Sequence, residues 1–378
     1  MLKVLHTING LHVGGAEKML LQLLAASDRG RFSPSVLSLL GPGAVASEIA
    51  ALRVNVYSLN MNLWLQAPLS WARVIGLARR LTPDVIQGWM YYGNLAGTLA
   101  WWSRRSQSRL VWSVHHSLAR LADEKPLSRR VIELSARLSR LPHAIVYCSQ
   151  ISARQHEALG FDRQRGVVIP NGIDTALFRP DPAAGARLRA ITGAPEGRPL
   201  VGMVARLHPM KDHANLLQTV AQLRRRGVDL HLVLIGRGVT IANPEMAGLL
   251  HPAELGDRVS LLGERHDLPE LIPGLDLCVL PSAWGEAFPL AVGDALASGV
   301  PCIVTDVGDC AWLVGDTGEV VPPRDSAALA AALNRWLDLP ESARKAQGMR
   351  GRQRVVQNFA LPAIAHRYDD LYAGLAAR

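Results

Sequence analysis

Two carboxylates, Glu286 and Asp294, stand eight residues apart in a segment that has no other charged side chain. Pro289 and Gly299 predict a helix over about 289–298, with proline at its first position and glycine just beyond its end. A carboxylate in so apolar a helix must accept hydrogen bonds if it is buried. Because helical side chains lean toward the N-terminus, Asp294 is expected to point toward Glu286 and the free N–H groups of the first turn. This arrangement would receive a polyol and a phosphate; the alternative is an Asp294 tied to a structural arginine and a solvated Glu286.

Two cations, Arg206 and Lys211, flank a proline-containing loop between an apolar strand at 200–204 and a helix. Fixed cations at the exit of a strand can clamp a diphosphate. Parallel α/β sheets bind ligands at the carboxyl ends of their strands, which favours this role over an ordinary surface position. The loops that hold Gly238 and Arg265 follow the next strands, and they either surround a base and a ribose or are only turns.

The first half of the chain offers a second set of candidates. A glycine-rich turn with Gly14, Gly15 and Glu17 follows the first strand and leads into an amphipathic helix. Glycines there allow a phosphate or an acceptor to approach the backbone, although a plain tight turn explains them equally well and the dinucleotide fingerprint is absent. His115 and His116 follow another strand, and one of them is a candidate catalytic residue, with a structural role as the alternative.

Short apolar runs alternate with helical patterns along the chain, which predicts parallel sheets with crossover helices. The alternation breaks at Pro170-Asn171-Gly172 and again across the proline-rich stretch 179–182. We therefore expect an α/β protein with two Rossmann-like domains joined near residue 180, and a ligand in the cleft between them. The expected strands are 2–8, 35–40, 54–59, 84–89, 110–114, 144–148, 167–169, 200–204, 229–235, 258–262, 275–280 and 301–305, and helices at 325–338, 340–357 and 361–377 end the chain.

The composition fits a two-domain globular protein, with 378 residues of which 49% are hydrophobic and 19% charged. Four cysteines without paired spacing predict buried thiols in a reducing compartment. The N-terminal apolar run is too short for a signal peptide, and no segment reaches the roughly 20 apolar residues of a membrane span. These features predict a cytoplasmic protein.

The net charge of +9 is unevenly distributed. Residues 1–180 carry 21 Lys and Arg against 10 Asp and Glu, or +11, whereas residues 181–378 carry 20 against 22, or −2. Arginines lie beside tryptophan and leucine across 101–140, a mixture that suits an anionic membrane surface or a phosphorylated acceptor, or simply solvated helix faces. Nucleic acid is not an expected partner, because no binding module accompanies the charge.

Several motifs occur in order along nearly the whole chain, and together they resemble a known family. They are Gly14-Gly15-Ala16-Glu17, Asn171-Gly172-Ile173-Asp174, Arg206 with Lys211, and Glu286 through Asp294 with Ala295-Leu296-Ala297-Ser298-Gly299-Val300-Pro301. The combination resembles the group 1 (family 4) glycosyltransferases. The resemblance implies the GT-B fold, in which two Rossmann-like domains face each other across a cleft. It places an acceptor-side domain at 1–175, a nucleotide-sugar-binding domain at 176–360, and a C-terminal helix at about 361–378 that packs back on the first domain.

The resemblance also implies roles for single residues. Arg206 and Lys211 would hold the donor diphosphate in place of a metal and stabilise the leaving nucleotide, while Glu286 would bind hydroxyls of the donor sugar. His115 matches the catalytic histidine of the first domain, with His116 as the alternative. The implied donor site comprises Gly14, Gly15, Arg206, Lys211, Gly238, Arg265, Glu286, Ala287, Phe288, Pro289, Leu290 and Asp294, and His116 and Glu17 lie on the acceptor side.

Asp294 departs from the family pattern, which usually has glutamate there. Its side chain is shorter by one C–C bond, about 1.5 Å. Its expected contact with the ribose hydroxyls is therefore weaker, or bridged by water.

These inferences predict a retaining, metal-independent glycosyltransferase of the hexosyltransferase type, with no cofactor besides its nucleotide-diphosphate sugar donor. The acceptor is expected to be a glycan or lipid-linked precursor in cell-envelope or polysaccharide synthesis, and the protein to be peripheral at the inner face of the membrane. Two alternatives stay open: a nucleotide-sugar 2-epimerase of the same fold, which needs no acceptor, and a nucleotide-sugar-binding regulatory protein, which the Asp294 departure suggests. A nicotinamide oxidoreductase ranks last, because the dinucleotide fingerprint is absent.

Overall fold

The computed structural model describes residues 1–12, 14–61, 67–105, 107–118 and 120–377. The chain folds into two compact units. Unit 1 comprises residues 1–172 and 361–378, and unit 2 comprises residues 173–360. The chain thus passes from unit 1 to unit 2 after residue 172, whereas the expected domain boundary was residue 175. Val13 of the glycine-rich turn lies outside the described residues.

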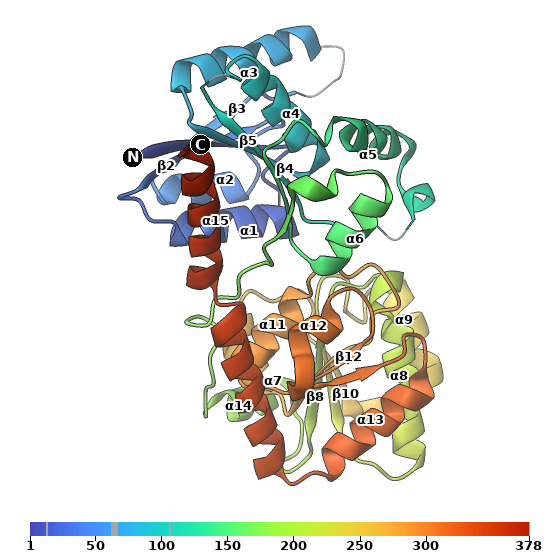
Figure 1. Cartoon of the computed structure of the whole chain (residues 1–378). Coiled ribbons are helices and arrows are strands. Elements are labelled where there is room, and N and C mark those ends of the chain that lie inside the picture. Colours follow the sequence, from blue (N-terminus) through green and yellow to red (C-terminus); the bar gives the residue numbers. More distant parts are fainter. Residues whose placement is uncertain (13, 62–66, 106, 119, 378) are drawn as a thin grey trace. The chain divides into compact units, whose positions relative to one another are not determined.

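Unit 1 is built on a parallel sheet with seven strands among the described residues, in the order β3-β2-β1-β4-β5-β6-β7 (Figure 1). The order runs outward in both directions from β1 and β4, which is the arrangement of a doubly wound α/β sheet. The strands are β1 (Leu2–Ile8), β2 (Phe32–Ser38), β3 (Asn55–Ser58), β4 (Val85–Trp89), β5 (Arg109–Val114), β6 (Ala144–Tyr147) and β7 (Gly166–Val168).

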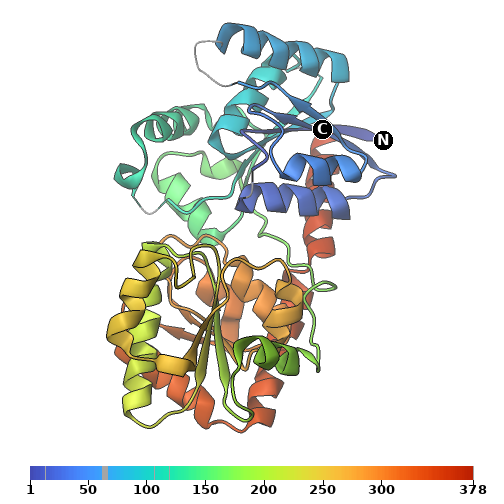
Figure 2. The same cartoon turned by 180° about the vertical axis from the view of Figure 1, so that it is seen from behind.

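Helices cover both faces of this sheet (Figure 2). Successive strand residues such as Val4 and Leu5 belong to different buried clusters, because side chains alternate between the faces of a strand. One cluster contains α1 (Gly15–Ala26), α2 (Val45–Ala51) and α15 (Leu361–Ala376), and the other contains α3 (Ala67–Leu81), α4 (Met90–Trp102), α5 (Pro126–Leu138) and α6 (Gln150–Ala158). The predicted apolar face of α1 is confirmed, since Met19, Leu20, Leu23 and Leu24 are all at most 2% exposed.

The last helix of the chain, α15, belongs to the core of unit 1. Ile364, Tyr368 and Tyr372 are buried in the cluster that also holds residues of α1 and β1. The Tyr372 hydroxyl donates a hydrogen bond to Gln87 Oε1 on β4. Helix α15 therefore supplies apolar surface that the first 172 residues need in order to close one face of their sheet.

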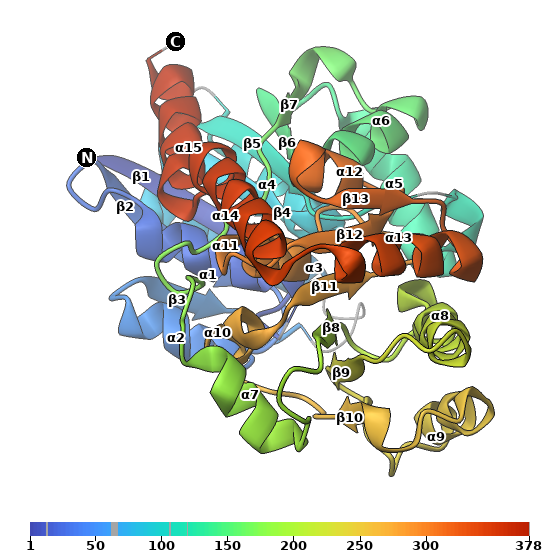
Figure 3. The same cartoon turned by 90° about the horizontal axis from the view of Figure 1, so that it is seen from below.

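Unit 2 has a parallel sheet with six strands among the described residues, in the order β10-β9-β8-β11-β12-β13, which can be followed in Figure 3. The strands are β8 (Leu200–Val204), β9 (His231–Ile235), β10 (Val259–Leu261), β11 (Leu277–Leu280), β12 (Cys302–Thr305) and β13 (Glu319–Val321). The helices are α7 (Ala184–Thr192), α8 (His213–Arg225), α9 (Pro244–Leu250), α10 (Leu268–Leu271), α11 (Leu290–Ala297), α12 (Cys310–Val314), α13 (Ser326–Asp338) and α14 (Glu341–Asn358).

The structure confirms the predicted α/β class and contains a strand at each expected position, with two differences. Strand β2 begins at Phe32, earlier than the expected residue 35, and β13 at the edge of the second sheet was not predicted. All four cysteines are free and buried, as expected. Among the described residues, no helix combines the length and apolar character needed to cross a membrane.

The packing of α15 generates a stability prediction. Ile364→Ala should lower the unfolding free energy of unit 1 by about 2–5 kcal/mol, because it opens a cavity at a position that is 0% exposed. His366→Ala on the same helix is the control, since His366 is exposed and Asp370 is its one ion-pair partner in the described part of the chain. Urea unfolding followed by circular dichroism measures both variants, and equal midpoints would contradict the role assigned to α15.

Candidate functional site

The candidate residues of unit 2 lie in loops at the carboxyl ends of adjacent strands. Strand β8 ends at Val204 and is followed by Arg206 and a 3-10 turn, η4 (Pro209–Lys211). Strand β11 pairs with β8, and its carboxyl end leads into the loop that contains Glu286. This edge of a parallel sheet is where α/β proteins bind ligands.

Lys211 and Glu286 form an ion pair between these two loops. Glu286 is 5% exposed, and Ser282 Oγ donates a second hydrogen bond of 2.5 Å to the same carboxylate oxygen, Oε1. A carboxylate this deeply buried requires such partners, because the loss of hydration is costly. Among the described residues none bonds to Oε2, so the pair leaves one carboxylate oxygen available to a ligand.

The backbones of the surrounding loops approach each other closely. The Ala283 N–H donates to the Met210 carbonyl at 2.8 Å. A Cβ at Gly308, whose φ is +62°, would lie 2.0 Å from the carbonyl oxygen of Glu286. A Cβ at Gly236 would likewise lie 2.0 Å from the Ala205 carbonyl oxygen. Glycine is required at both positions, since any side chain would push a loop of the site away.

Helix α11 begins one residue later than predicted. Pro289 takes the N-cap position with φ −79° and ψ 92°, and Leu290 is the first helical residue. No described residue accepts a hydrogen bond from the N–H groups of Leu290 and Ala291, so the first turn of α11 offers two free donors. Phe288 packs against Trp312 and Phe359, which leaves its backbone rather than its side chain for a ligand.

The other candidates of unit 2 are placed as follows. Arg206 is exposed and makes no ion pair with another described residue. Arg265 is bound to Asp267 through two hydrogen bonds, so a ligand would have to compete for it. Gly238, with φ +81°, lies in the loop after β9, and Asp294 is 8% exposed on α11. The structure thus brings Lys211 and Glu286 into direct contact.

His115 lies in unit 1, directly after β5. Its ring stacks on Trp89, with centroids 4.9 Å apart and an interplanar angle of 17°. Its Nδ1 is 3.0 Å from Asn171 Oδ1, while Nε2 is shielded from solvent and has no hydrogen-bond partner among the described residues. Burial lowers the pKa of His115 to about 4, although the bond to Asn171 acts in the opposite direction.

His116 points to a different group of residues. Its Nδ1 is 3.2 Å from the Tyr91 hydroxyl, and its Nε2 is 3.5 Å from Glu124. The same Tyr91 hydroxyl is 2.7 Å from His156 Nε2. Burial lowers the pKa of His116, whereas Glu124 raises it. No described residue is a charged partner of His115, so the two adjacent histidines differ in chemistry.

The glycine-rich turn of unit 1 forms the start of α1. Gly14 is the N-cap residue and Gly15 the first helical residue. A Cβ at Gly14 would lie 2.4 Å from Glu17 Oε2, so the Glu17 carboxylate folds back over the helix N-terminus. Burial raises the pKa of Glu17, opposed by a backbone hydrogen bond and by His12. The favourable position for an anion at this helix end is therefore taken by the protein's own carboxylate.

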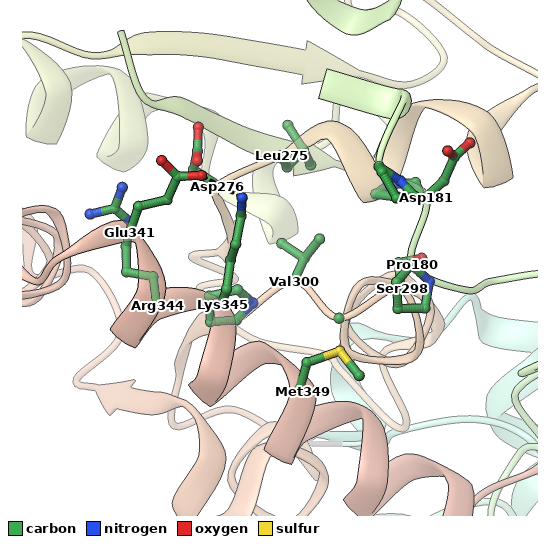
Figure 4. Close-up of a pocket in the computed structure, with 14 residues that line it drawn as sticks. Pro180, Asp181, Leu275, Asp276, Ser298, Val300, Glu341, Arg344, Lys345 and Met349 are labelled. Carbon is green, nitrogen blue, oxygen red and sulfur yellow. Dashed lines mark ion pairs between the residues drawn. The ribbon is translucent and has the colours of Figure 1, made fainter. Parts of the chain in front are cut away.

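A separate hollow of about 290 Å³ lies at the amino ends of the strands of unit 2, whereas the candidate site lies at their carboxyl ends (Figure 4). Asp276 and Val300, which line it, precede the amino ends of β11 and β12. Its charged groups are already engaged: Glu341 pairs with Lys345, and Asp276 accepts a 2.7 Å bond from the Leu200 N–H. This hollow is distinct from the candidate site. Among the described residues no cluster of His, Cys, Asp or Glu is arranged to hold a metal ion.

Several residues of these sites were not identified from the sequence. Ser282 and Gly308 contact Glu286 but belong to no recognisable motif. Tyr91 contacts His116 and His156 in the folded protein, but these residues are far apart in the sequence. Asn171 was noted as part of a motif, and its contact with His115 could not be read from that spacing.

Two family models match successive parts of the chain. The model described as Glycosyltransferase Family 4 matches residues 13–177, and that described as Glycosyl transferases group 1 matches residues 198–338. The chain belongs to the group 1 (family 4) glycosyltransferases. The resemblance inferred from the motifs is thereby confirmed.

Other glycosyltransferase-related proteins agree with this assignment. EpsF of Bacillus subtilis (strain 168) is 28% identical over 308 residues, which is 80% of this chain and 79% of EpsF. The lipopolysaccharide core biosynthesis mannosyltransferase LpcC of Rhizobium leguminosarum bv. viciae is 34% identical, over 55% of this chain and 59% of LpcC. The crystal structure of Anabaena HepE in complex with UDP superposes with a TM-score of 0.85 and 24% identity, covering 99% of this chain and 100% of HepE. The fold of this glycosyltransferase is GT-B, as expected.

The glycine contacts around Glu286 can be tested by substitution. Gly308→Ala should destabilise the protein by more than the roughly 1–2 kcal/mol that a left-handed backbone costs an alanine, because its Cβ also meets the Glu286 carbonyl. Gly193→Ala is a matched control, with φ +68° and no atom within 4 Å of the added Cβ. Chemical denaturation measures both changes in unfolding free energy. If the two variants lose the same amount, the packing against Glu286 is not a constraint.

Proposed function

We propose that this protein is a retaining glycosyltransferase that moves a sugar from a nucleotide-diphosphate sugar to an acceptor hydroxyl. The observation that carries the proposal is the ion pair between the half-buried Lys211 and the buried Glu286, in a loop that leads directly to the free N–H groups at the start of α11. A cation and free amide donors suit a diphosphate, and a carboxylate oxygen suits the hydroxyls of a sugar. HepE, solved with UDP and with UDP-glucose, supports a nucleotide sugar as the donor.

The proposed reaction is attack on the same face from which the nucleotide leaves. The acceptor oxygen forms a bond to the anomeric carbon while the bond from that carbon to the diphosphate oxygen breaks. The departing diphosphate keeps the electron pair and takes the proton of the acceptor hydroxyl. Arg206 and Lys211 stabilise the charge that develops on the diphosphate, in the role that a metal ion serves elsewhere. Glu286 orients the sugar through its hydroxyls, and Asp294 is assigned to the ribose.

The proposed acceptor is a glycan or lipid-linked precursor of the cell envelope. LpcC, a lipopolysaccharide core mannosyltransferase, supports this class of acceptor. In the same proposal, Gly238, Arg265 and residues 287–290 complete the donor site, and Glu17 and His116 lie on the acceptor side. Gly14 and Gly15 belong to the donor site only as a backbone that a ligand can approach closely, because Glu17 occupies the anion position at this helix N-terminus.

A panel of nucleotide sugars tests the donor directly. A ligand that binds only the folded state raises the melting temperature, so the true donor should stabilise the protein in a concentration-dependent manner. Release of the nucleotide should then require an acceptor. If turnover proceeds without any acceptor and yields an epimerised sugar, the transferase proposal is wrong.

Lys211→Ala should lower kcat by roughly 100-fold or more, because one fixed stabiliser of the leaving diphosphate is lost. The KM for the donor should change less, since the interaction strengthens as the bond breaks. The change also leaves the buried carboxylate of Glu286 without its ion-pair partner, which can destabilise the fold. The double variant Lys211→Met/Glu286→Gln removes both charges and serves as the folding control. Steady-state kinetics with unchanged kcat in Lys211→Ala would remove this lysine from the mechanism.

We further propose that unit 1 contacts an anionic membrane surface through α5. Leu127 and Leu134 are exposed by 47% and 44% and stand seven residues apart, two helical turns on one face. Arg129, Arg130 and Arg137 lie on the same helix. Exposed leucines with flanking arginines are the composition of an interfacial helix.

Vesicle sedimentation tests this contact. The unmodified protein should sediment with vesicles that contain anionic lipid at low salt, and less so at high salt. Leu127→Ser/Leu134→Ser should reduce the bound fraction, whereas Ile241→Ser, at a 70% exposed position of unit 2, should not. Protein that stays in the supernatant under all conditions would refute the membrane proposal.

A further inference from the structure

The motif Asn171-Gly172-Ile173-Asp174 has a structural explanation at three of its four positions. A Cβ at Gly172 would lie 2.9 Å from Leu361 Cα, so glycine permits a close approach of two segments. The Ile173 N–H donates to the Phe359 carbonyl at 2.8 Å. Asp174 accepts hydrogen bonds from the N–H groups of Ala176 and Leu177. These contacts leave the Asn171 side chain unexplained by the turn itself.

The Asn171 side chain instead contacts His115. Asn171 is 6% exposed, and its Oδ1 lies 3.0 Å from His115 Nδ1. An amide oxygen only accepts hydrogen bonds, so this contact requires the proton of the imidazole to be on Nδ1. A neutral imidazole has a single N–H, and its other nitrogen then carries a bare lone pair.

The ring is also fixed in its plane. Trp89 stacks on His115 at 4.9 Å, and Trp89 Nε1 is itself held by a 3.1 Å bond to His6 Nδ1. With its face against Trp89 and Nδ1 bound to Asn171, the ring has one orientation in which both contacts are kept. Its Nε2 is shielded from solvent and has no partner among the described residues. A buried acceptor usually has a hydrogen-bond partner, so Nε2 has the capacity to accept a bond from a water or a ligand.

We propose that Asn171 is a positioning residue, whose amide oxygen keeps the proton of His115 on Nδ1 so that Nε2 accepts a hydrogen bond from a hydroxyl of the bound sugar. The inference rests on the proposed function, because it takes the sugar to be the ligand of His115. A neutral nitrogen acceptor attracts a hydroxyl and offers no donor to a phosphate or carboxylate oxygen. His115 therefore discriminates in favour of a hydroxyl at this place.

Burial reinforces this choice, because it keeps the ring neutral. The pKa of His115 is lowered to about 4 by desolvation, so the ring carries a single proton at neutral pH. The position of that single proton then decides whether Nε2 accepts or donates. Asn171 determines that position through its hydrogen bond to His115 Nδ1.

Nitrogen-15 NMR of the ligand-free protein tests the tautomer directly. His156 provides one reference in the same spectrum, since its Nδ1 is 2.7 Å from the Ser152 carbonyl and must carry the proton. His208 provides the opposite reference, because its Nδ1 accepts from the Met210 N–H at 3.2 Å. His115, identified by the signal lost in His115→Gln, should match His156. A proton on Nε2 in the unmodified protein would overturn the proposal whatever any variant does.

Kinetics of Asn171 variants test the consequence. Asn171→Ala should lower kcat by roughly 10- to 100-fold, by analogy with the loss seen when a partner that orients a metal-ligating histidine is removed. Asn171→Asp should restore the Nδ1–H tautomer and much of the activity, since a carboxylate oxygen also accepts from Nδ1. If Asn171 had only a structural role, restoring an acceptor for His115 Nδ1 would not restore activity. The kcat of Asn171→Asp would then be as low as that of Asn171→Ala.

A double-mutant cycle separates positioning from folding. In a His115→Gln background, Asn171→Ala should change kcat by no more than about twofold, because the group it orients is already absent. Equal losses in both backgrounds would show that Asn171 acts elsewhere. Failure of the proposed function is recognised independently: no nucleotide sugar would then stabilise the unmodified protein, although the tautomer of His115 could still be as proposed.

Discussion

The ion pair between Lys211 and Glu286 is the interaction on which the structure of the unit 2 site depends. It joins the loops that follow β8 and β11, and both charges are largely removed from solvent. Burying two charges costs free energy, and the cost is offset only if the pair is close and further hydrogen bonds are present. Ser282 supplies one such bond, and Gly308 allows the Glu286 backbone to take the position that the pair requires. The pair is thus better understood as a fixed receptor than as a source of stability.

Three histidines of unit 1 follow a different rule. His6 and His156 are buried and His115 is half-buried, and desolvation lowers their pKa values to about 3, 4 and 4 for His6, His115 and His156. Each is therefore neutral at physiological pH and interacts through a specific donor or acceptor atom rather than through charge. Charged groups bind phosphate strongly, whereas neutral groups with a fixed hydrogen-bonding pattern select hydroxyls. Under the proposed function, the charged groups of unit 2 suit the diphosphate and the neutral groups of unit 1 suit hydroxyls.

The sequence predicted most of the fold because strands and helices leave local signals. Apolar runs such as 200–204 coincide with β8, and the apolar face of α1 is buried as its period of 3.6 requires. Strand β13 was missed because Glu319–Val321 is too short to show a pattern. Pro289 was placed inside its helix because proline is common at both the first helical position and the cap, and only backbone angles distinguish them.

The candidate site was predicted less completely, and for a different reason. Glu286 and Lys211 were identified because charged residues beside apolar strands stand out in a sequence. Ser282 did not stand out, and Asn171 stood out only as part of a motif. Serine and asparagine are common in loops, and the contacts that give these two residues their roles are not revealed by local spacing. Tyr91 and His156 meet across 65 positions of the chain, which no local pattern reports. Residues that orient others are therefore the ones that spacing alone fails to reveal.

Asn171 connects the site to the path of the chain. The chain leaves unit 1 after Gly172 and returns at Leu361, and the Gly172–Leu361 approach and the Ile173–Ala360 bridge hold these two crossing segments side by side. Glycine and isoleucine serve that crossing, while the residue just before them fixes the imidazole of His115. Because Asn171 is one residue from the crossing, a change in backbone angles there would move its amide oxygen relative to His115 Nδ1. The same four-residue motif thus fixes both where the chain passes between its units and which nitrogen of His115 is left to accept a hydrogen bond.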